Sequence, residues 1–260
     1  MLKHRLIAVL ILLDGKVVQS VRFKHTNVIH YDLIHAIETL NSWSVDEIVV
    51  LNVDREPNKR NEFRDNLKRI SRKCFVPLTA GGWVTDFEYG ASLIRNGADK
   101  LVVNSALFDN PAVVSQLSEQ YGRQCIVASL DFLTHDDGTR TVAIDRGRKD
   151  IGLSPKEAAR HAHSNGAGEI LFNSISHDGA RKGYDLEALR EVCLSVPIPV
   201  IAFGGVMSWN HLVAGIEAGA DAVAAANIFH YTEHSTRRAK EVMARAGIAV
   251  RQSGFAKLGS

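Results

Sequence analysis

Several polar residues directly follow short apolar runs, a position that suits catalytic groups. Asp131 ends the run 125–131, and a carboxyl group beside apolar walls can have the raised pKa that general acid–base catalysis requires. A capping aspartate is the alternative interpretation of Asp131. Asp178-Gly179 follows another run, but Asp178 is the weaker acid–base candidate because Asp-Gly is mainly a turn signal.

Glycines and small polar residues at the ends of the runs are suited to phosphate binding. Glycine allows backbone N–H groups to approach phosphate oxygens, and Asn and Ser side chains supply neutral donors. A tight turn without a ligand is the alternative, but Gly-Gly occurs at two equivalent places, which favours phosphate. The candidate phosphate-binding or substrate-binding residues from these run ends are Gly82, Asn104, Ser105, Asp178, Gly179, Gly204, Gly205, Ala226 and Asn227.

The elements that must position these residues come in two similar halves. The motif Pro77-Leu78-Thr79-Ala80-Gly81-Gly82 is echoed by 199–205, and Gly97-Ala98-Asp99 is echoed by Gly219-Ala220-Asp221. The offset is 122 residues, from 97 to 219. Self-similarity at a fixed period indicates a repeat architecture, and a period this long indicates two duplicated (βα)4 units.

Eight apolar runs of buried-strand length alternate with stretches of helical period. The alternation predicts parallel strands joined by helices. Two such halves predict an α/β fold, a single (β/α)8 TIM barrel over residues 1–260 with half-barrels of about 1–122 and 123–250. A β-hairpin around Asp137-Gly138 is expected after the fifth run. The expected barrel strands lie at 6–13, 47–53, 75–80, 100–104, 125–131, 169–174, 198–203 and 222–227.

In a barrel of this kind the active site lies at the carboxyl ends of the strands, which is where Asp131 and the phosphate candidates fall. The opposite end receives four charged residues of alternating sign, each at the head of an apolar run. They are Arg5, Glu47, Lys100 and Glu169. We expect them to form a ring across the barrel floor, and from the residues alone a stabilising salt-bridge layer is the favoured interpretation.

The composition narrows the classes of partner. Lys and Arg (31) nearly balance Asp and Glu (29), for a formal net charge of +2, so neither nucleic acid nor a membrane surface is expected as a partner. No apolar run approaches the ~18 residues of a membrane span, and the apolar run at the start fits a buried strand better than a signal peptide. A cytoplasmic location is therefore expected. Three cysteines without paired spacing predict free thiols, and no metal or cofactor is expected.

Further motifs are spread along the chain, among them Asp14-Gly15-Lys16-Val17-Val18, Gly97-Ala98-Asp99-Lys100, Gly166-Ala167-Gly168-Glu169, Asp178-Gly179, Gly183-Tyr184-Asp185 and Ile228-Phe229-His230. With them the chain resembles the cyclase subunit of imidazole glycerol phosphate synthase, a lyase of histidine biosynthesis. That family is a duplicated barrel supplied with ammonia by a glutaminase partner. The resemblance implies that Arg5, Glu47, Lys100 and Glu169 form an ammonia gate and that Asp131 is one of two catalytic aspartates.

The chain departs from this family at the mouth of the barrel. Ile11 stands where the second catalytic aspartate is expected, and an isoleucine cannot transfer a proton. The other departures are Gln19 for a loop lysine, Asn52 for a strand aspartate, Asn173 for a threonine and Trp83 for a glycine. We count Asn173 among the substrate-binding residues. We expect the ring of Trp83 to crowd its phosphate site, so that an anion binds more readily beside Gly204-Gly205.

An apolar residue at position 11 and Asn173-Ser174 resemble a side branch of the family. That branch works with a glutaminase and a sugar amidotransferase to make acetamidino groups on bacterial surface sugars, such as lipopolysaccharide O-antigen. The resemblance implies an ammonia-channelling subunit with a phosphorylated or nucleotide-sugar substrate. The alternatives are an authentic cyclase that works through Asp131, and a non-enzymatic scaffold and ammonia conduit for a sugar amidotransferase.

Overall fold

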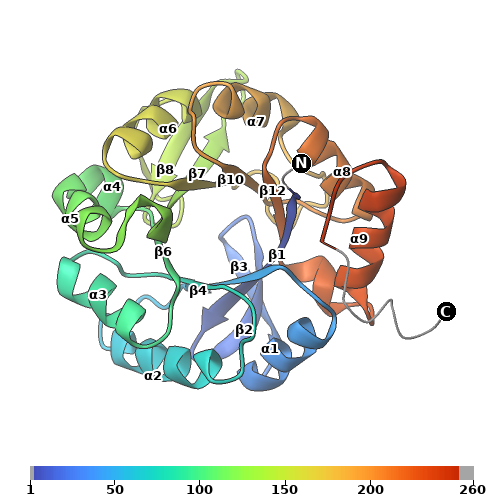
Figure 1. Cartoon of the computed structure of the whole chain (residues 1–260). Coiled ribbons are helices and arrows are strands. Elements are labelled where there is room, and N and C mark those ends of the chain that lie inside the picture. The colour runs from blue at the N-terminus through green and yellow to red at the C-terminus, as the bar shows by residue number, and fades with distance from the viewer. Residues whose placement is uncertain (1–2, 252–260) are drawn as a thin grey trace.

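The computed structural model describes residues 3–251, and within them a closed parallel barrel carries the expected alternation of strands and helices (Figure 1). The ring closes because β7 pairs with β10 as well as with β6. Each expected run of the sequence contributes one barrel strand. In ring order the strands are β1 (Arg5–Leu13), β4 (Glu47–Asn52), β5 (Leu78–Gly81), β6 (Lys100–Val103), β7 (Ile126–Thr134), β10 (Glu169–Ser174), β11 (Val200–Phe203) and β12 (Ala222–Ala225).

Helices surround the barrel, and several begin where a side chain caps free backbone N–H groups. Asp86 caps α3, Asp185 caps α7, and Ser154 forms a capping box with Glu157 before α6. The helices are α1 (Leu33–Ser42), α2 (Lys59–Ser71), α3 (Phe87–Arg95), α4 (Ala106–Asp109), α5 (Pro111–Tyr121), α6 (Pro155–Ser164), α7 (Leu186–Cys193), α8 (Trp209–Glu217) and α9 (Ser235–Arg245), with short 3-10 turns η1 (Arg123–Cys125) and η2 (Asn227–His230).

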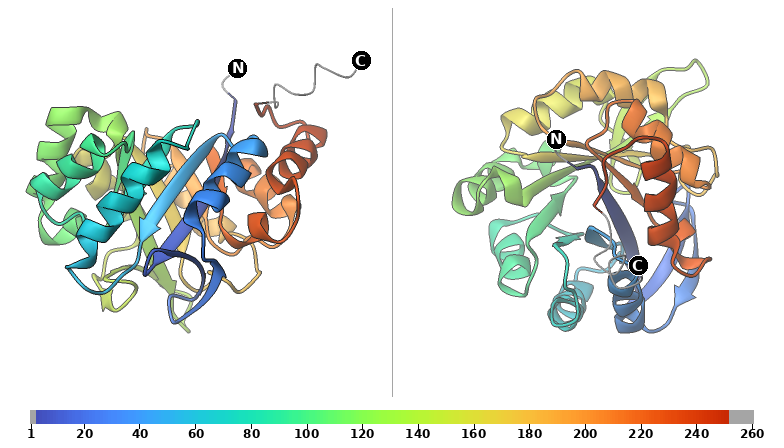
Figure 2. Two further views of the ribbon diagram at one scale, coloured as in Figure 1. Left: turned by 90° about the horizontal axis from the view of Figure 1, so that it is seen from below. Right: turned by 45° about the vertical axis from the view of Figure 1, so that its right-hand side comes forward.

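Two hairpins extend from the carboxyl ends of the strands, at the same end of the barrel (Figure 2). The expected one pairs β7 with β8 (Arg140–Ile144), which continues into β9 (Lys149–Asp150). The other, β2 (Lys16–Val21) with β3 (His25–His30), follows β1 and was missing from the eight-run interpretation. The exposed and half-buried residues of β3 explain the omission, since they form no apolar run.

The two-residue period of the strands decides which side chains face the barrel interior. An apolar cluster separate from the outer core fills the interior, and it includes Ile7, Val9, Ile11, Val49, Val102, Val127, Leu171, Ile201, Phe203, Ala222 and Ala224. Its members alternate along each strand. The same alternation turns Glu47 and Glu169 inward at one end of the barrel and Asp131 and Asn173 inward at the other.

Equivalent positions of the two sequence halves have the same local structure. The carboxylate of Asp99 accepts a hydrogen bond from the backbone N–H of Leu78 at 2.8 Å, and that of Asp221 accepts one from Val200 at 3.0 Å. Both partners are shifted by the 122-residue offset of the sequence repeat. Gly97 and Gly219 likewise share a left-handed backbone, with φ of 105° and 108°.

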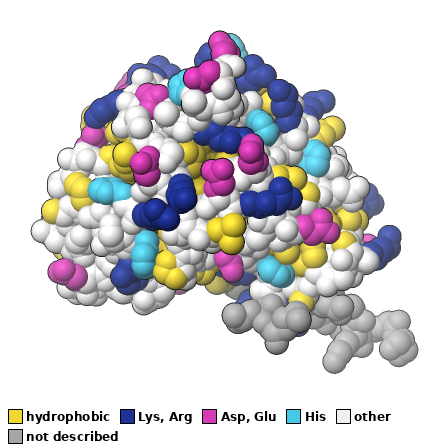
Figure 3. Space-filling view, turned by 90° about the horizontal axis from the view of Figure 1, so that it is seen from above, with side chains coloured by type: hydrophobic (Ala, Val, Ile, Leu, Met, Phe, Trp, Pro, Cys, Tyr) yellow, Lys and Arg dark blue, Asp and Glu magenta, His cyan; other side chains and the backbone are white. Residues whose placement is uncertain are grey.

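The surface over the helices carries mixed charge. Figure 3 shows one side of the molecule, on which Lys and Arg side chains are interspersed with Asp and Glu. A field of one sign, which binding to nucleic acid requires, is not present on that face. Within residues 3–251, every helix is too short or too polar to cross a bilayer.

Candidate functional site

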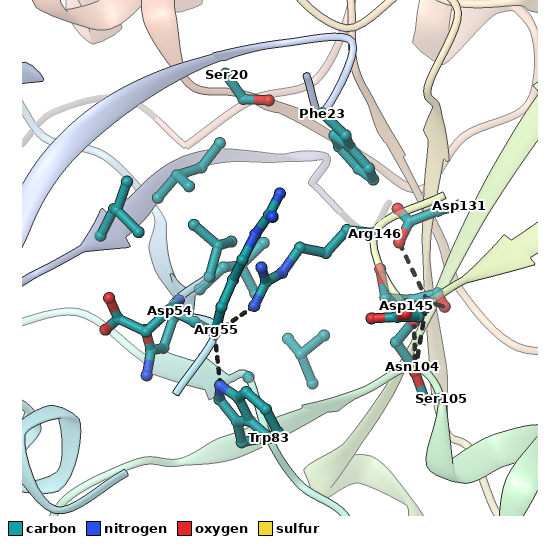
Figure 4. Close-up of a pocket in the computed structure, with 18 of the residues that line it drawn as sticks. Ser20, Phe23, Asp54, Arg55, Trp83, Asn104, Ser105, Asp131, Asp145 and Arg146 are labelled. Atoms are coloured by element: carbon teal, nitrogen blue, oxygen red, sulfur yellow. Dashed lines mark hydrogen bonds between the residues drawn. The ribbon is translucent and has the colours of Figure 1, made fainter. Parts of the chain in front are cut away.

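A cavity of about 640 Å³ opens at the carboxyl ends of the strands (Figure 4). This volume lies in the range of roughly 300–1,000 Å³ that is usual for small-molecule sites. Its floor is formed by inward-facing residues of β1, β4, β6, β7 and β10, and its rim by the tips of the two hairpins and by the loop after β4. The residues of the cavity lining that are discussed in this subsection and in those that follow are Ile11, Ser20, Phe23, Lys24, Asn52, Arg55, Gly82, Trp83, Asn104, Ser105, Asp131, Arg146, Asn173 and Asp178.

Asp131 lies in the floor of this cavity on β7. Its carboxylate accepts hydrogen bonds from the side-chain amides of Asn104 at 3.2 Å and Asn173 at 2.9 Å. Burial raises the pKa of Asp131 to about 7, and the neighbouring charge of Asp178 raises it further against the opposing effect of Asn173. A carboxyl group that titrates near neutral pH can both donate and accept a proton under physiological conditions.

Asp178 is a structural anchor for the β2–β3 hairpin as well as a cavity residue. The hydroxyl of Ser20 donates to its carboxylate at 2.6 Å, and a Cβ on the neighbouring Gly179 would lie 2.8 Å from the carbonyl oxygen of Ser20. Burial raises the pKa of Asp178, with these hydrogen bonds acting in the other direction. The Asp-Gly turn seen in the sequence therefore has a packing role against β2.

Ile11 is the inward-facing residue of β1 at the level of the cavity. Its side chain is 6% exposed and belongs to the apolar interior cluster. On the neighbouring strands it is in register with Leu51 and Val18. At this position the wall of the cavity is therefore apolar, and Asp131 has no carboxylate partner there.

The structure divides the phosphate candidates into two groups. Gly82, Asn104 and Ser105 line the cavity, whereas Gly204, Gly205, Ala226 and Asn227 are absent from its lining in the described part of the chain. The Gly-Gly pair after β11 packs closely instead. A Cβ on Gly204 would lie 2.5 Å from Oδ1 of Asn173, and one on Gly205 would lie 2.4 Å from the carbonyl oxygen of Gly183. Binding of phosphate at either group remains a prediction.

Trp83 lies in the lining of the cavity, and crowding of the phosphate site by its ring stays a prediction. The backbone at Trp83 keeps a left-handed φ of 60°, the region that favours glycine. Its indole N–H donates to the carbonyl oxygen of Asp54 at 2.7 Å, and its own carbonyl accepts from Arg60 at 2.7 Å. These bonds hold the ring against the loop after β4, where it forms part of the wall of the cavity.

Three buried amide atoms near the mouth have no partner among the described residues. They are Nδ2 of Asn52, Oδ1 of Asn173 and Oδ1 of Asn227. Buried polar groups are normally hydrogen-bonded, so each of them has unused capacity for a bound ligand or water. Asn52 and Asn173 line the cavity itself, which makes the mouth suited to a polar molecule.

Basic residues at the cavity rim were not identified from the sequence. Lys24 lies at the tip of the β2–β3 hairpin, Arg55 in the loop after β4, and Arg146 at the turn between β8 and β9. Burial and the neighbouring charges of Arg55 and Arg148 lower the pKa of Arg146. The available signal was two arginines in the turn Asp145-Arg146-Gly147-Arg148, but only the fold brings that turn to the loop after β4.

At the other end of the barrel, the four charged residues form a closed ring. Arg5 donates to Glu47 at 2.8 Å and also to Glu169. Lys100 contacts Glu47 at 3.0 Å and Glu169 at 2.9 Å. The carboxylates are buried and the cations half-buried. Burial acts to lower the pKa of Arg5, but hydrogen bonds and charges from Glu169 and Glu47 outweigh it and raise that pKa.

The described residues hold no group of three or more His, Cys, Asp or Glu side chains arranged to bind a metal ion. The expected free thiols are confirmed for Cys74, Cys125 and Cys193. Burial raises the pKa of each, to about 11 for Cys193. Their thiolate forms are therefore disfavoured at neutral pH.

Comparison with known proteins places this geometry in a family. The family model described as "Histidine biosynthesis protein" matches residues 5–235. The match runs from the first residue of β1 to the first residue of α9, and so includes every barrel strand, both hairpins, the charged ring and the cavity.

Proposed function

The chain belongs to the histidine biosynthesis protein family, and from this premise we propose that it receives ammonia at the charged ring and delivers it to the cavity. In this proposal a glutaminase subunit docks on the barrel floor and supplies the ammonia. The nitrogen is used to form an amidine, an acetamidino group, on a bacterial surface nucleotide sugar, together with a sugar amidotransferase. The cytoplasm, where glutamine and nucleotide sugars are available, is the proposed location.

The observation that carries this proposal is the contrast between the two ends of the barrel. The ring of Arg5, Glu47, Lys100 and Glu169 is complete and closed by ion pairs. At the mouth, Asp131 faces the apolar Ile11 in place of a second acid–base group. Buried ion pairs are often no more stabilising than apolar residues of similar volume, so stability alone does not explain why the ring is complete. A complete ring in a barrel whose mouth is altered therefore supports a functional role for the end of the barrel that carries the ring.

The barrel interior between the two ends suits the passage of a neutral molecule. Apolar side chains such as Val49, Val127 and Leu171 lie between the ring and the cavity. Ammonia without its proton carries no charge, and its transfer into apolar surroundings is far less costly than that of ammonium. An interior of this kind would therefore favour NH3 over NH4+ on the way to the mouth.

Two exposed apolar side chains on the floor side support a docked partner. Phe75 is 84% exposed in the segment before β5, and Leu194 is 89% exposed directly after α7. Both segments lead into the amino ends of barrel strands, the end that carries the charged ring. Exposed apolar and aromatic residues near such a feature are suited to the core of a protein interface.

A second candidate function is favoured by the pKa of Asp131. At about 7, it matches the requirement for a general acid or base at neutral pH, which the cyclase reaction of histidine biosynthesis needs. Expression of the chain in a bacterial histidine auxotroph that lacks the cyclase separates the two functions. Growth without histidine supports the cyclase, and its absence with the protein present supports the proposed ammonia-handling role.

The main proposal is tested by comparing glutamine with ammonium as the nitrogen source in the assembly reconstituted with its glutaminase. We expect Lys100→Met and Glu169→Gln to reduce glutamine-dependent product formation while ammonium-dependent formation is retained. Lys240→Met is the matched control, because Lys240 forms a buried 2.6 Å ion pair with Asp46 outside the ring. Thermal melting identifies variants that fail to fold. Folded ring variants that transfer ammonia as well as the control would contradict the proposal.

A further inference from the structure

The outer strand of the β2–β3 hairpin has a free edge. β3 pairs with β2 alone, and among the described residues the backbone of 25–28 forms no hydrogen bond to another segment. These four residues are exposed and pair in regular register with β2, whose register with β3 shifts only between Val17 and Val18. An unpaired edge of this kind can accept a strand from another chain.

This edge lacks the usual protection against pairing. Exposed edges are commonly blunted by charged side chains, lysine above all, or by proline. Residues 25–28 read His-Thr-Asn-Val, without Lys, Arg, Asp, Glu or Pro. Thr and Val are moreover residues that favour strands. The edge therefore keeps its capacity to pair with a further strand.

Exposed apolar side chains flank the edge. Val28 is 43% exposed, Tyr31 directly after β3 is 78% exposed, and Tyr231 after η2 is 64% exposed. The hydroxyl of Tyr231 donates to Gln19 on β2 at 3.1 Å, and the ammonium group of Lys16 lies 5.5 Å from the ring centre of Tyr31. Because tyrosine is enriched in protein interfaces, the edge and its flanks form a surface suited to another protein.

The hairpin is also strongly basic. Residues 16–31 contain Lys16, Arg22 and Lys24 but no Asp or Glu, whereas the formal net charge of the whole chain is only +2. Among the described residues, none of these three cations forms an ion pair with a carboxylate. The positive charge of the hairpin is therefore available to a binding partner.

Two acidic residues beside the hairpin are already bonded elsewhere. Asp14, which precedes β2, pairs with Lys59 at 3.0 Å. Asp178, beneath the hairpin, is buried and accepts the hydroxyl of Ser20 at 2.6 Å. Both carboxylates are thus engaged on the side of the barrel, and the outer edge of β3 carries no acidic side chain.

This charge distinguishes between two kinds of occupant for the edge. A second copy of the chain would place its own three cations alongside, and like charges brought together in a sheet are destabilising. An extended segment that carries Asp or Glu would instead be attracted. The edge therefore favours an acidic strand from a different protein over self-association.

The hairpin also forms part of the cavity rim. Ser20, Phe23, Lys24 and Thr26 line the cavity from the hairpin, which projects from the carboxyl end of the barrel (Figure 2). A protein bound along β3 therefore lies beside the opening. Ammonia that leaves the barrel would reach such a partner without first entering bulk water, where it takes up a proton at neutral pH.

We propose that the free edge of β3 receives an acidic, extended segment of the enzyme that consumes the ammonia, as an added strand. The inference rests on the proposed function, which makes this enzyme a sugar amidotransferase. It adds the surface on which the enzyme docks, at the end of the barrel opposite to the glutaminase. Both partners can then be bound at once, one at each end of the barrel interior.

The test measures binding of the purified sugar amidotransferase to the full chain in complex with its glutaminase, by biolayer interferometry. Val28→Asp places a negative charge on the edge, and Val28→Thr is its matched control because threonine keeps the branched shape without a charge. Arg22→Glu reverses one charge of the hairpin, and Lys68→Glu is the corresponding control at an exposed position of α2. Thermal melting and glutaminase binding identify variants that fail to fold.

We expect Val28→Asp and Arg22→Glu each to weaken amidotransferase binding about tenfold or more, while each control changes it less than about twofold. Glutaminase binding should be the same in the parent and all four variants, because the glutaminase docks at the other end of the barrel. Binding of the amidotransferase to the parent should also weaken as salt rises, since salt screens the attraction between charged surfaces.

Hydrogen exchange identifies the added strand itself. When the amidotransferase binds, amide exchange within residues 25–28 should slow at least about tenfold, as expected for newly hydrogen-bonded amides, whereas exchange in β9, the outer strand of the other hairpin, should not change. Equal binding by the parent and both test variants, or unchanged exchange in residues 25–28, would overturn the inference and leave the proposed function intact. Absence of amidotransferase binding to any of the proteins would contradict the proposed function as well.

Discussion

At Asp131 the fold changes the chemistry of an ordinary carboxyl group. Its pKa is raised from 3.8 to about 7 in the folded protein, chiefly by burial. Between these values the folded state binds a proton that the unfolded state has lost, so this group's contribution to stability falls as pH rises from about 4 to 7. Above pH 7 the cost is fully present and constant.

Asp131→Asn removes this titration. We expect the free energy of unfolding of the variant, relative to the parent, to increase as pH rises from 4.5 to 7 and then to level off. Urea unfolding at a series of pH values measures this difference. A difference that does not change with pH would show that Asp131 does not titrate in this range.

The isoleucine at position 11 leads to a second prediction at the scale of a single residue. General acid–base groups typically contribute about 10²- to 10⁴-fold each, so a barrel with one such group should cyclise the bis-phosphorylated histidine intermediate at least 10²-fold more slowly than a genuine cyclase. Ammonia-dependent turnover of that intermediate by the purified chain is the measurement. Turnover within about tenfold of a genuine cyclase would contradict the ammonia-handling role and favour the second candidate function.

Some of the residues at the mouth could be predicted from the sequence, and others could not. Asp131 could be placed at the mouth because it ends an apolar run, although β7 itself continues to Thr134 in the hairpin with β8. Arg55 and Arg146 could not, because each is an ordinary loop arginine until the fold brings their loops together. The orientation of Trp83 was also out of reach, since it depends on a hydrogen bond to the carbonyl oxygen of Asp54.

At the scale of elements, the β2–β3 hairpin is held to the rest of the mouth by a pair of histidines. Nε2 of His30 on β3 lies 3.0 Å from Nδ1 of His230 in η2. Burial lowers the pKa of both, to about 4 for His230. One ring must supply an unprotonated nitrogen for this bond, so the contact requires at least one neutral histidine.

Acid should therefore loosen this hairpin. A histidine with a lowered folded pKa contributes stability that is present above the unfolded value of about 6.5 and is lost as pH falls toward 4. We expect hydrogen exchange in β3 to accelerate, relative to β8, as pH falls from 6.5 to 4.5, after correction for intrinsic exchange. In His230→Asn this added acceleration should be smaller, while the bond between Ser20 and Asp178 remains in both proteins. An unchanged pH dependence in the variant would exclude the histidine pair as the cause.

The barrel itself was predictable because its strands are buried on both faces and read as continuous apolar runs. The hairpin after β7 was predictable from its Asp-Gly turn. The β2–β3 hairpin was not, because β3 has mainly exposed polar residues and its pairing depends on contacts with distant loops, such as that between Gly179 and Ser20. Elements stabilised by tertiary contacts leave little signal in their own sequence.

At the scale of the whole molecule, the charged ring links strands from both halves of the barrel. Lys100→Met would leave Glu47 and Glu169 buried with one cation between them. Breaking one side of a buried ion pair typically costs about 3–5 kcal/mol, and we expect a loss of that order in urea unfolding. Glu169→Gln should cost less, because the amide still accepts a hydrogen bond from Arg5. Equal stability of Lys100→Met and the parent would mean that the ring pairs are not formed in solution.

The central claim, that ammonia travels inside the barrel from a docked glutaminase to the mouth, is tested most directly by isotope competition. The reconstituted assembly is given glutamine labelled with ¹⁵N in its side-chain amide together with an excess of unlabelled ammonium, and the product nitrogen is analysed by mass spectrometry. Internal transfer predicts that the parent product keeps the ¹⁵N label and that the label is diluted in folded Lys100→Met but not in Lys240→Met. Equal dilution to the composition of the bulk solution in all three proteins would contradict the account.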